Sequence, residues 1–185
     1  MNDEALELRR EIQNWQTRKF TIFAATTSFV TALSAYLATS ADKIDVDWRI
    51  VACFFYLIIG AACLVTWLFA RFNIKIGTYL WVIENSRWEQ YQREFVSSTK
   101  DFSYGLNNIL AMWYLVMGVA GAGVSYASIG FHSTTSVMES IYWLVFVCGS
   151  LLFLYFVWLL FFRSYPVDKF VEDWKRIKNK METDT

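Results

Sequence analysis

The sequence predicts an all-α, polytopic membrane protein with four transmembrane helices and further amphipathic helices on the cytoplasmic side. Three observations predict this class: long runs without charged residues, a high apolar content, and few residues that break helices. Of the 185 residues, 56% are hydrophobic and 19% are aromatic, whereas soluble domains are typically about 45–50% apolar. A single Pro and eight Gly argue against a chain built from turns and short strands.

Four runs contain no Asp, Glu, Lys or Arg, and each is long enough to cross a bilayer. A helix rises about 1.5 Å per residue, so 20 or more residues reach about 30 Å, the thickness of the hydrocarbon core. None of the runs alternates polar and apolar residues in the manner of a barrel strand. The four predicted spans are Phe20–Thr39, Ile50–Ala70, Ile109–Gly130 and Ile141–Phe162.

Short connections are expected to pair these spans into two antiparallel hairpins. Residues 40–49 join the first two spans and residues 131–140 join the last two. Five segments follow from this division. They are a cytoplasmic amphipathic helix (1–19), a first transmembrane hairpin (20–70), a cytoplasmic helical segment (71–108), a second transmembrane hairpin (109–162) and a cytoplasmic C-terminal amphipathic helix (163–185).

Basic residues are concentrated on one side of the predicted membrane. Segments 1–19, 71–108 and 163–185 hold four, five and six Lys and Arg residues, and the two hairpin connections together hold two. Because the excess of Lys and Arg lies in cytoplasmic segments, both termini are expected in the cytoplasm. The compact connections favour a bacterial inner membrane. The 17 basic and 17 acidic residues give no net charge that would attract nucleic acid.

The segments outside the spans carry apolar stripes at helical spacing. Two interpretations are open: the stripes lie flat on the membrane, or they pack together as a cytoplasmic layer. Near-zero net charges favour the layer. Residues 1–19 are expected to continue as a helix into the first span. The clearest stripe is the predicted interaction helix for a cytoplasmic protein partner, and it consists of Val167, Phe170, Val171, Trp174 and Ile177.

Segment 71–108 is expected to contain two helices. The first breaks near Asn85. Ser86 followed by Glu89 matches a capping box, which predicts that a second helix starts there. Residues 97–101 are the expected linker to the third span.

The first span gathers small and hydroxyl-bearing side chains on one stripe. The stripe consists of Ala24, Thr27, Ser28, Thr31 and Ala35. Small residues allow helix backbones to approach in lipid, so packing inside the chain is the simpler interpretation. The sharper hypothesis is that the hydroxyl groups line an uncharged polar path at the centre of an oligomer.

The third span has small residues on two nearly opposite faces. One face would pack within the chain and the other against a second copy, which predicts a homo-oligomer. The second and fourth spans are rich in Phe, Leu, Trp and Tyr and are expected to face lipid. The small residues predicted for these packing faces are Gly118, Gly121, Ala122, Gly123 and Ala127.

Nothing in the sequence predicts catalysis, a cofactor site or a metal site. The spans contain no Asp, Glu, Lys or Arg, the residues that usually mark proton relays in membranes. His132 is the only histidine, and the three cysteines lie inside spans without a paired spacing. We therefore expect a protein that is not an enzyme.

Three hypotheses of function remain after this exclusion. The first is an oligomeric, channel-like or membrane-perturbing effector that is controlled by its cytoplasmic helices. The second is a membrane anchor or scaffold subunit that docks a soluble partner. The third, a small transporter or lipid-handling protein, has less support because the spans carry no charge and no proline break. In each case the lipid bilayer is a partner.

Overall fold

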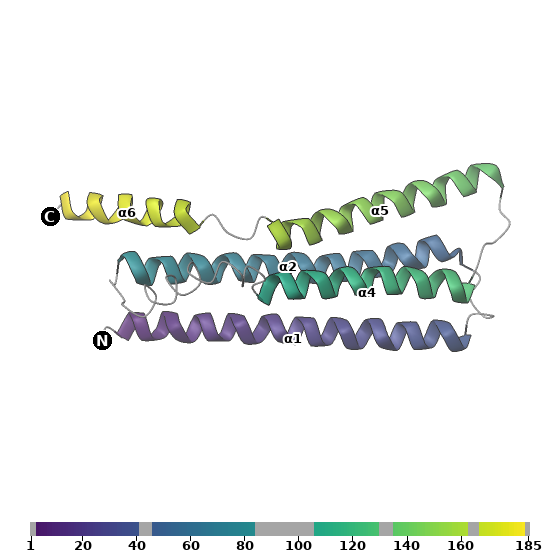
Figure 1. The fold of residues 1–185 in the computed structure, drawn as a ribbon, viewed down its shortest axis with the longest axis horizontal. Coiled ribbons are helices and arrows are strands. Elements are labelled where there is room, and N and C mark those ends of the chain that lie inside the picture. Colours follow the sequence, from purple (N-terminus) through teal and green to yellow (C-terminus); the bar gives the residue numbers. More distant parts are fainter. Residues whose placement is uncertain (1–2, 41–45, 84–105, 130–134, 163–166, 184–185) are drawn as a thin grey trace.

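The computed structural model describes residues 3–40, 46–83, 106–129, 135–162 and 167–183. These residues form five α-helices and confirm the all-α class. The helices are α1 (Asp3–Ser40), α2 (Trp48–Val82), α4 (Leu106–Ile129), α5 (Ser136–Phe162) and α6 (Val167–Thr183). They lie along one long axis, with α6 beyond the end of α5 (Figure 1).

Four of the helices are long and apolar enough to cross a membrane, which indicates an integral membrane protein. The candidate spans are Leu6–Ser40, Trp48–Val82, Asn108–Ile129 and Ser136–Phe161. They contain the first two uncharged runs that the sequence predicts and all but the last residue of the other two. Charged residues flank those runs, so the apolar length of each helix matches the hydrocarbon core.

Two of these helices extend well beyond the predicted spans. α1 has 38 residues and α2 has 35, lengths of about 57 Å and 52 Å, against about 30 Å for the hydrocarbon core. The expected helix in residues 1–19 is therefore continuous with the first span, from Asp3 onward. The N-terminal end of α1, the C-terminal end of α2 and α6 all lie at the same end of the molecule (Figure 1).

α2 ends at Val82, and the Ile83 N–H donates to the Tyr79 carbonyl as a cap. The helix predicted to restart at Ser86, the linker at 97–101 and His132 lie outside the described residues.

α2 is the central helix of the bundle, because it packs against α1, α4, α5 and α6. Half of its most apolar stretch is buried, against 17% for α1 and 22% for α5. The expectation that the second span faces lipid is therefore wrong for half of the helix. Phe55 and Ile59 are fully buried and fill the interior, whereas Phe54 and Leu57 are exposed. α5 does expose large apolar side chains, as expected, including Leu144 and Leu151.

The glycines of α4 allow this close packing. A Cβ atom on Gly118 would lie 2.5 Å from the ring of Phe153 in α5. A Cβ atom on Gly121 would lie 2.8 Å from Cγ and 3.2 Å from Cβ of Phe55 in α2. Contacts this short leave no room for a methyl group, so each glycine lets α4 approach its neighbour at van der Waals distance.

A buried hydrogen bond also ties α2 to α4. The Thr66 hydroxyl donates to the Ala62 carbonyl at 2.8 Å, and the Tyr114 hydroxyl lies 3.0 Å from Thr66 Oγ1. Because the Thr66 proton is already used, Tyr114 is the donor in this pair. Both side chains are fully buried, so the hydrogen bond satisfies polar groups that lipid could not solvate.

Gly121→Ala is expected to lower the free energy of unfolding by about 1–3 kcal/mol, the usual effect of overpacking a filled interior. The Phe55 ring cannot move away easily, because its own Cβ is part of the clash. Equilibrium unfolding in mixed detergent micelles, followed by circular dichroism, measures the change.

Gly77→Ala is the matched control, because nothing lies within 4 Å of its added Cβ. Alanine also favours helix over glycine, so this variant should be at least as stable as the wild type. Equal destabilisation by both variants would contradict the packing described for Gly121.

Candidate functional site

The structure divides the hydroxyl stripe of α1 into an outer and an inner part. Ala24, Ser28, Thr31 and Ala35 lie on the exposed side of the helix, and we call these four residues the α1 seam. Thr27 instead faces α4: its hydroxyl donates to the Phe23 carbonyl at 2.9 Å and lies 3.5 Å from Met117 Sδ. Thr27 therefore belongs to the contact within the chain.

The spacing of the α1 seam is four, three and four residues, and exposed Ala38 extends it by a further three. This is the heptad spacing of helices that pack along one another, and it contains two pairs of small residues four apart. The seam lies on the least buried of the four candidate spans.

The seam hydroxyls differ from their neighbours in their hydrogen bonds. Thr21 and Thr39 each donate to the carbonyl one turn earlier, at 3.1 and 3.0 Å. Among the described residues, Ser28 and Thr31 have no hydrogen-bond partner for their hydroxyl groups. These two hydroxyls can therefore reach water or another copy of the chain.

The two small faces of α4 have different surroundings. Gly118 and Gly121 are buried against α5 and α2, and Ala122 packs on the same core. Gly123 and Ala127 are exposed, and nothing lies within 4 Å of a Cβ atom built on Gly123. One face thus packs within the chain, and the other lies on its surface.

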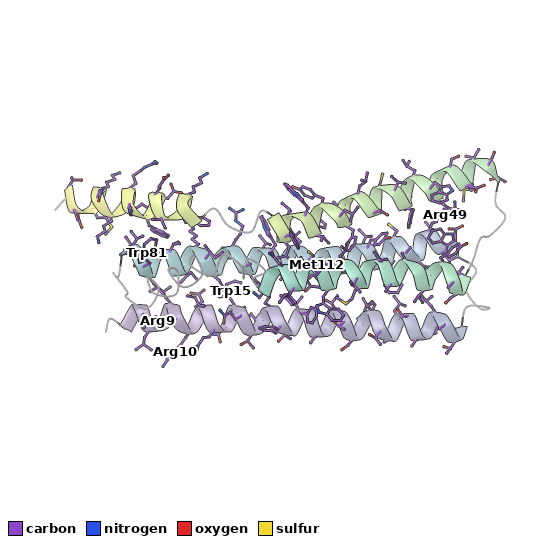
Figure 2. The ribbon with its side chains drawn as sticks, in the orientation of Figure 1. Arg9, Arg10, Trp15, Arg49, Trp81 and Met112 are labelled. Atoms are coloured by element: carbon purple, nitrogen blue, oxygen red, sulfur yellow. The ribbon has the colours of Figure 1, made fainter. Side chains whose placement is uncertain are left out.

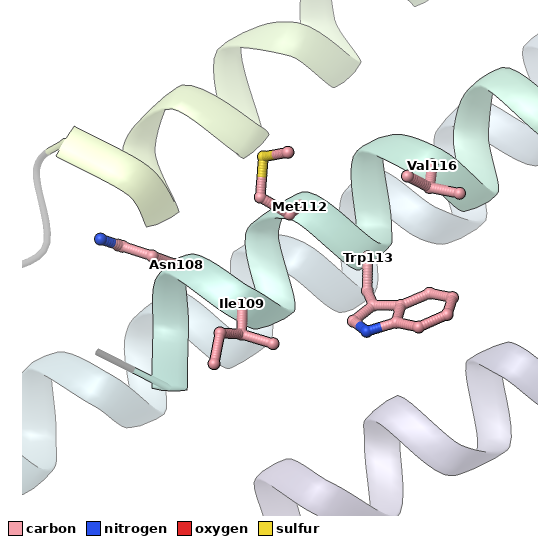
Figure 3. A pocket seen from close by; sticks show the side chains of 5 residues that line it. All are labelled: Asn108, Ile109, Met112, Trp113 and Val116. Carbon is pink, nitrogen blue, oxygen red and sulfur yellow. The ribbon is translucent and has the colours of Figure 1, made fainter. Parts of the chain in front are cut away.

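A shallow apolar groove of about 290 Å³ lies on the first half of α4 (Figure 3). All five lining residues come from this one helix: Asn108, Ile109, Met112, Trp113 and Val116. The groove belongs to a candidate span, where lipid tails suit an apolar surface.

α6 packs on the C-terminal extension of α2. Trp174 Nε1 donates to the Lys75 carbonyl at 3.3 Å, and the Trp174 ring meets the Tyr79 ring edge-on with centroids 5.0 Å apart. Lys178 Nζ donates at 3.2 Å to the carbonyl of Val82, in the last turn of α2, where a cation also favours the helix dipole.

The predicted interaction stripe of α6 is therefore largely used inside the chain. Val171 is buried and Phe170 and Trp174 are half-buried, whereas Ile177 is 44% exposed. The side chain of Val167 lies outside the described residues. The exposed large apolar residues that α6 offers to a partner are Ile177 and Met181.

A cluster that sequence reasoning missed lies where α2 begins. Asp47 is the N-cap of α2, and its Oδ1 accepts from the backbone N–H of Arg49 at 2.8 Å. Arg49 Nε and Nη2 donate to the two carboxylate oxygens of Asp47, each at 2.8 Å. Arg49 is fully buried, although its position in a short polar connection predicts a solvated side chain.

Aromatic and acidic groups of α5 cover this ion pair. The guanidinium carbon of Arg49 lies 5.3 Å from the Tyr142 ring centroid and 5.1 Å from that of Trp143. Glu139 Oε1 lies 4.0 Å from Arg49 Nη1. The cluster joins the start of α2 to the first two turns of α5, at the end of the molecule where Arg49 lies (Figure 2). An Asp two residues before an Arg, at the start of an apolar run, is the signal that could have identified it.

The buried face of α4, α6 and the Asp47–Arg49 cluster make packing contacts and ion pairs. Within the part of the chain that the structure describes, no group of three or more His, Cys, Asp or Glu side chains gathers to hold a metal ion.

Comparison of the chain with protein-family models, with curated proteins and with solved structures found no match. A proposal of function therefore rests on the surfaces described above.

Arg49→Met is expected to lower the free energy of unfolding by about 3–5 kcal/mol, because it leaves the buried carboxylate of Asp47 without its cation. The double variant Asp47→Asn, Arg49→Met should regain most of this loss, since Asn is an equally good N-cap and carries no charge.

Unfolding of both variants in mixed micelles measures the two changes. If the double variant is as unstable as Arg49→Met alone, the ion pair is not the source of the stabilisation.

Proposed function

We propose that this chain is a non-enzymatic, oligomeric integral membrane protein that acts as a channel-like or membrane-perturbing effector controlled by its cytoplasmic helices. The observation that carries the proposal is the α1 seam: small and hydroxyl-bearing residues at heptad spacing, on the exposed side of a candidate span. In lipid, such a surface is better matched by another helix than by acyl chains.

The proposed topology is two antiparallel hairpins in a bacterial inner membrane, with both termini in the cytoplasm. The end that holds α6 and the N-terminal part of α1 carries most of the Lys and Arg residues, which supports placing it on the cytoplasmic side. The Asp47–Arg49 cluster then lies at the outer surface.

A polar path would run between copies, because the interior of one copy is occupied by side chains. Phe55, Ile59 and Tyr114 are fully buried in the middle of the bundle. Ser28 and Thr31 point outward from α1 and carry hydroxyl groups that accept and donate hydrogen bonds to water. Uncharged hydroxyl groups of this kind suit the wall of a narrow pore.

α1 and α2 each continue as one helix from the membrane part into the cytoplasmic part. This continuity supports control of the membrane part by the cytoplasmic helices. α6 contacts the extension of α2, and the same helix packs against α1, α4 and α5 in its membrane part. A ligand or partner that binds better when α6 is displaced from α2 would also change how α2 packs against α1, α4 and α5. The reason is that the same helix makes the contact with α6 and the contacts in the membrane part.

Thr31→Leu is expected to abolish the permeability of vesicles that contain the protein, because a branched apolar side chain would replace the hydroxyl group on the pore wall. Thr31→Ala should keep most of the flux, since it preserves the small volume. Dye or ion release from proteoliposomes measures both variants, with equal amounts of reconstituted protein. Flux that Thr31→Leu leaves unchanged would contradict a pore along the α1 seam.

A membrane anchor or scaffold subunit is the second candidate. Two exposed apolar residues at the end of α6 favour the anchor: Ile177 at 44% and Met181 at 64%. Exposed apolar side chains suit contact with a soluble partner. An anchor depends on its partner and leaves the permeability of the membrane unchanged.

Two variants of α6 separate the candidates. Trp174→Ala removes the hydrogen bond to Lys75 and the contact with Tyr79, so it should alter permeability if α6 controls a channel. Ile177→Ser with Met181→Ser leaves the α2 contact intact and should not alter it. The anchor would be favoured if only the double variant lost binding of the soluble partner and neither the wild type nor any variant made the membrane permeable.

A further inference from the structure

An open cavity of about 340 Å³ lies along α2, between α1 and α6. It is lined by Leu8 of α1, by Trp174 of α6, and by four residues of α2 that span two helical turns: Phe72, Lys75, Ile76 and Tyr79. The lining is mostly apolar, and exposed Lys75 supplies its one cation. The cavity is therefore amphipathic.

The depth of the cavity places it next to the lipid headgroups. The uncharged run of α2 ends at Ala70, and Lys75 follows about 7.5 Å further along the helix. The headgroup region extends about 5–8 Å beyond the hydrocarbon core. Lys75 thus lies at the level of the lipid phosphates, and Phe72 lies between it and the acyl chains.

Lys75 has no acidic partner among the described residues. α2 contains no Asp or Glu, and no ion pair joins Lys75 to Glu7 or Glu11, the acids of α1 on either side of Leu8. α6, which packs against α2, carries Glu172 and Asp173, but no ion pair joins either of them to α2 in the described residues.

Aromatic rings, in place of carboxylates, hold the neighbouring guanidinium groups. Arg71 lies 5.0 Å from the Trp67 ring and 6.0 Å from the Phe170 ring, and Arg18 lies 5.8 Å from the Trp15 ring. Cation–π contacts of this kind leave the positive charge uncompensated. Lys75 and the two arginines therefore leave positive charge on the membrane side of the cavity, which favours an anion there.

We propose that this cavity binds the headgroup of an anionic phospholipid from the cytoplasmic leaflet, with the Lys75 ammonium on its phosphate. Phe72 and Ile76 pack against the glycerol and the first acyl carbons, an apolar contact that a soluble phosphate cannot make. Basic pockets on the cytoplasmic side of membrane helices are suited to this chemistry. The inference rests on the orientation given under the proposed function, and not on the oligomer or the pore.

Such a lipid would touch all three elements of the cytoplasmic layer at once. Leu8, Lys75 and Trp174 belong to α1, α2 and α6, so a bound headgroup stabilises the arrangement in which α6 rests on α2. The fraction of anionic lipid in the inner leaflet would thereby affect the packing of α6 on α2, the contact proposed to control the membrane part.

The test is native mass spectrometry of the full chain, released from nanodiscs that contain equal amounts of phosphatidylglycerol and phosphatidylcholine. The wild type is expected to retain phosphatidylglycerol preferentially. Lys75→Gln should reduce this preference about fivefold, since one basic group near an anionic surface contributes an effect of that size. Lys75→Arg should retain it.

Arg10→Gln is the matched control, because it removes the same charge from an exposed residue of α1 whose side chain points away from the other helices (Figure 2). It should leave the lipid preference unchanged. Equal losses in Arg10→Gln and Lys75→Gln would overturn the proposal, because general charge attraction would then explain the retention.

Leu8→Trp tests the cavity without changing charge. The larger side chain fills the space beside Phe72 and should reduce phosphatidylglycerol retention as Lys75→Gln does, while the helix content measured by circular dichroism stays the same. Normal retention in this variant would overturn the site.

Displacement of the lipid by millimolar glycerol phosphate would also overturn it, in favour of a soluble phosphate ligand.

The orientation is tested separately from the lipid site. Lys75→Cys, in a variant whose Cys53, Cys63 and Cys148 are replaced by Ala, should react in intact cells with a membrane-permeant thiol reagent and not with an impermeant one. Reaction with the impermeant reagent would overturn the orientation and the assignment to the cytoplasmic leaflet. Native mass spectrometry measures bound lipid on the monomer as well as on any oligomer. A chain that fails to oligomerise therefore still tests the lipid site.

Discussion

Helices in a bilayer are not drawn together by the hydrophobic effect, because lipid tails are as apolar as the side chains themselves. Their association depends on close packing, and in this chain the packing converges on α2. Gly121 of α4 admits the Phe55 ring, and Gly118 of the same helix admits Phe153 of α5. The remaining contacts are arranged around this interior, so a methyl group at Gly121 affects the whole bundle.

Polar interactions fix the two ends of the central helix in different ways. At its start, the buried Asp47–Arg49 pair caps α2 and is covered by aromatic rings of α5. At its end, Trp174 and Lys178 of α6 bind backbone carbonyls of the last turns. The first arrangement is buried. The second lies beyond the uncharged run of α2, which ends at Ala70, so it is the end at which we expect control of the membrane part.

The four spans were predictable because lipid imposes a minimum length on uncharged helices, and that length is visible in the sequence. The central place of α2 was not predictable from its bulky residues, since large side chains suit lipid and a glycine-lined interior equally well. Periodicity grouped the α1 stripe, of which Ala24, Ser28, Thr31 and Ala35 lie on the exposed side. It did not separate Thr27, which contacts Met117, because a stripe about 100° wide covers both exposed and packed positions.

The burial of Arg49 was missed for a related reason. Charge counting treats every Lys and Arg in a connection as solvated, and it does not consider a carboxylate two residues earlier that caps the helix. The cavity between α1 and α6 is lined by residues 8, 75 and 174. These residues are far apart in the sequence and come together only through tertiary packing, which no local pattern reveals.

A contact between copies of the chain along the α1 seam is tested by the native mass of the protein in lipid nanodiscs. We expect a discrete oligomer of at least three copies, because fewer copies cannot enclose a water path between their helices. A monomer would rule out the contact and leave the α1 seam as a lipid-facing surface.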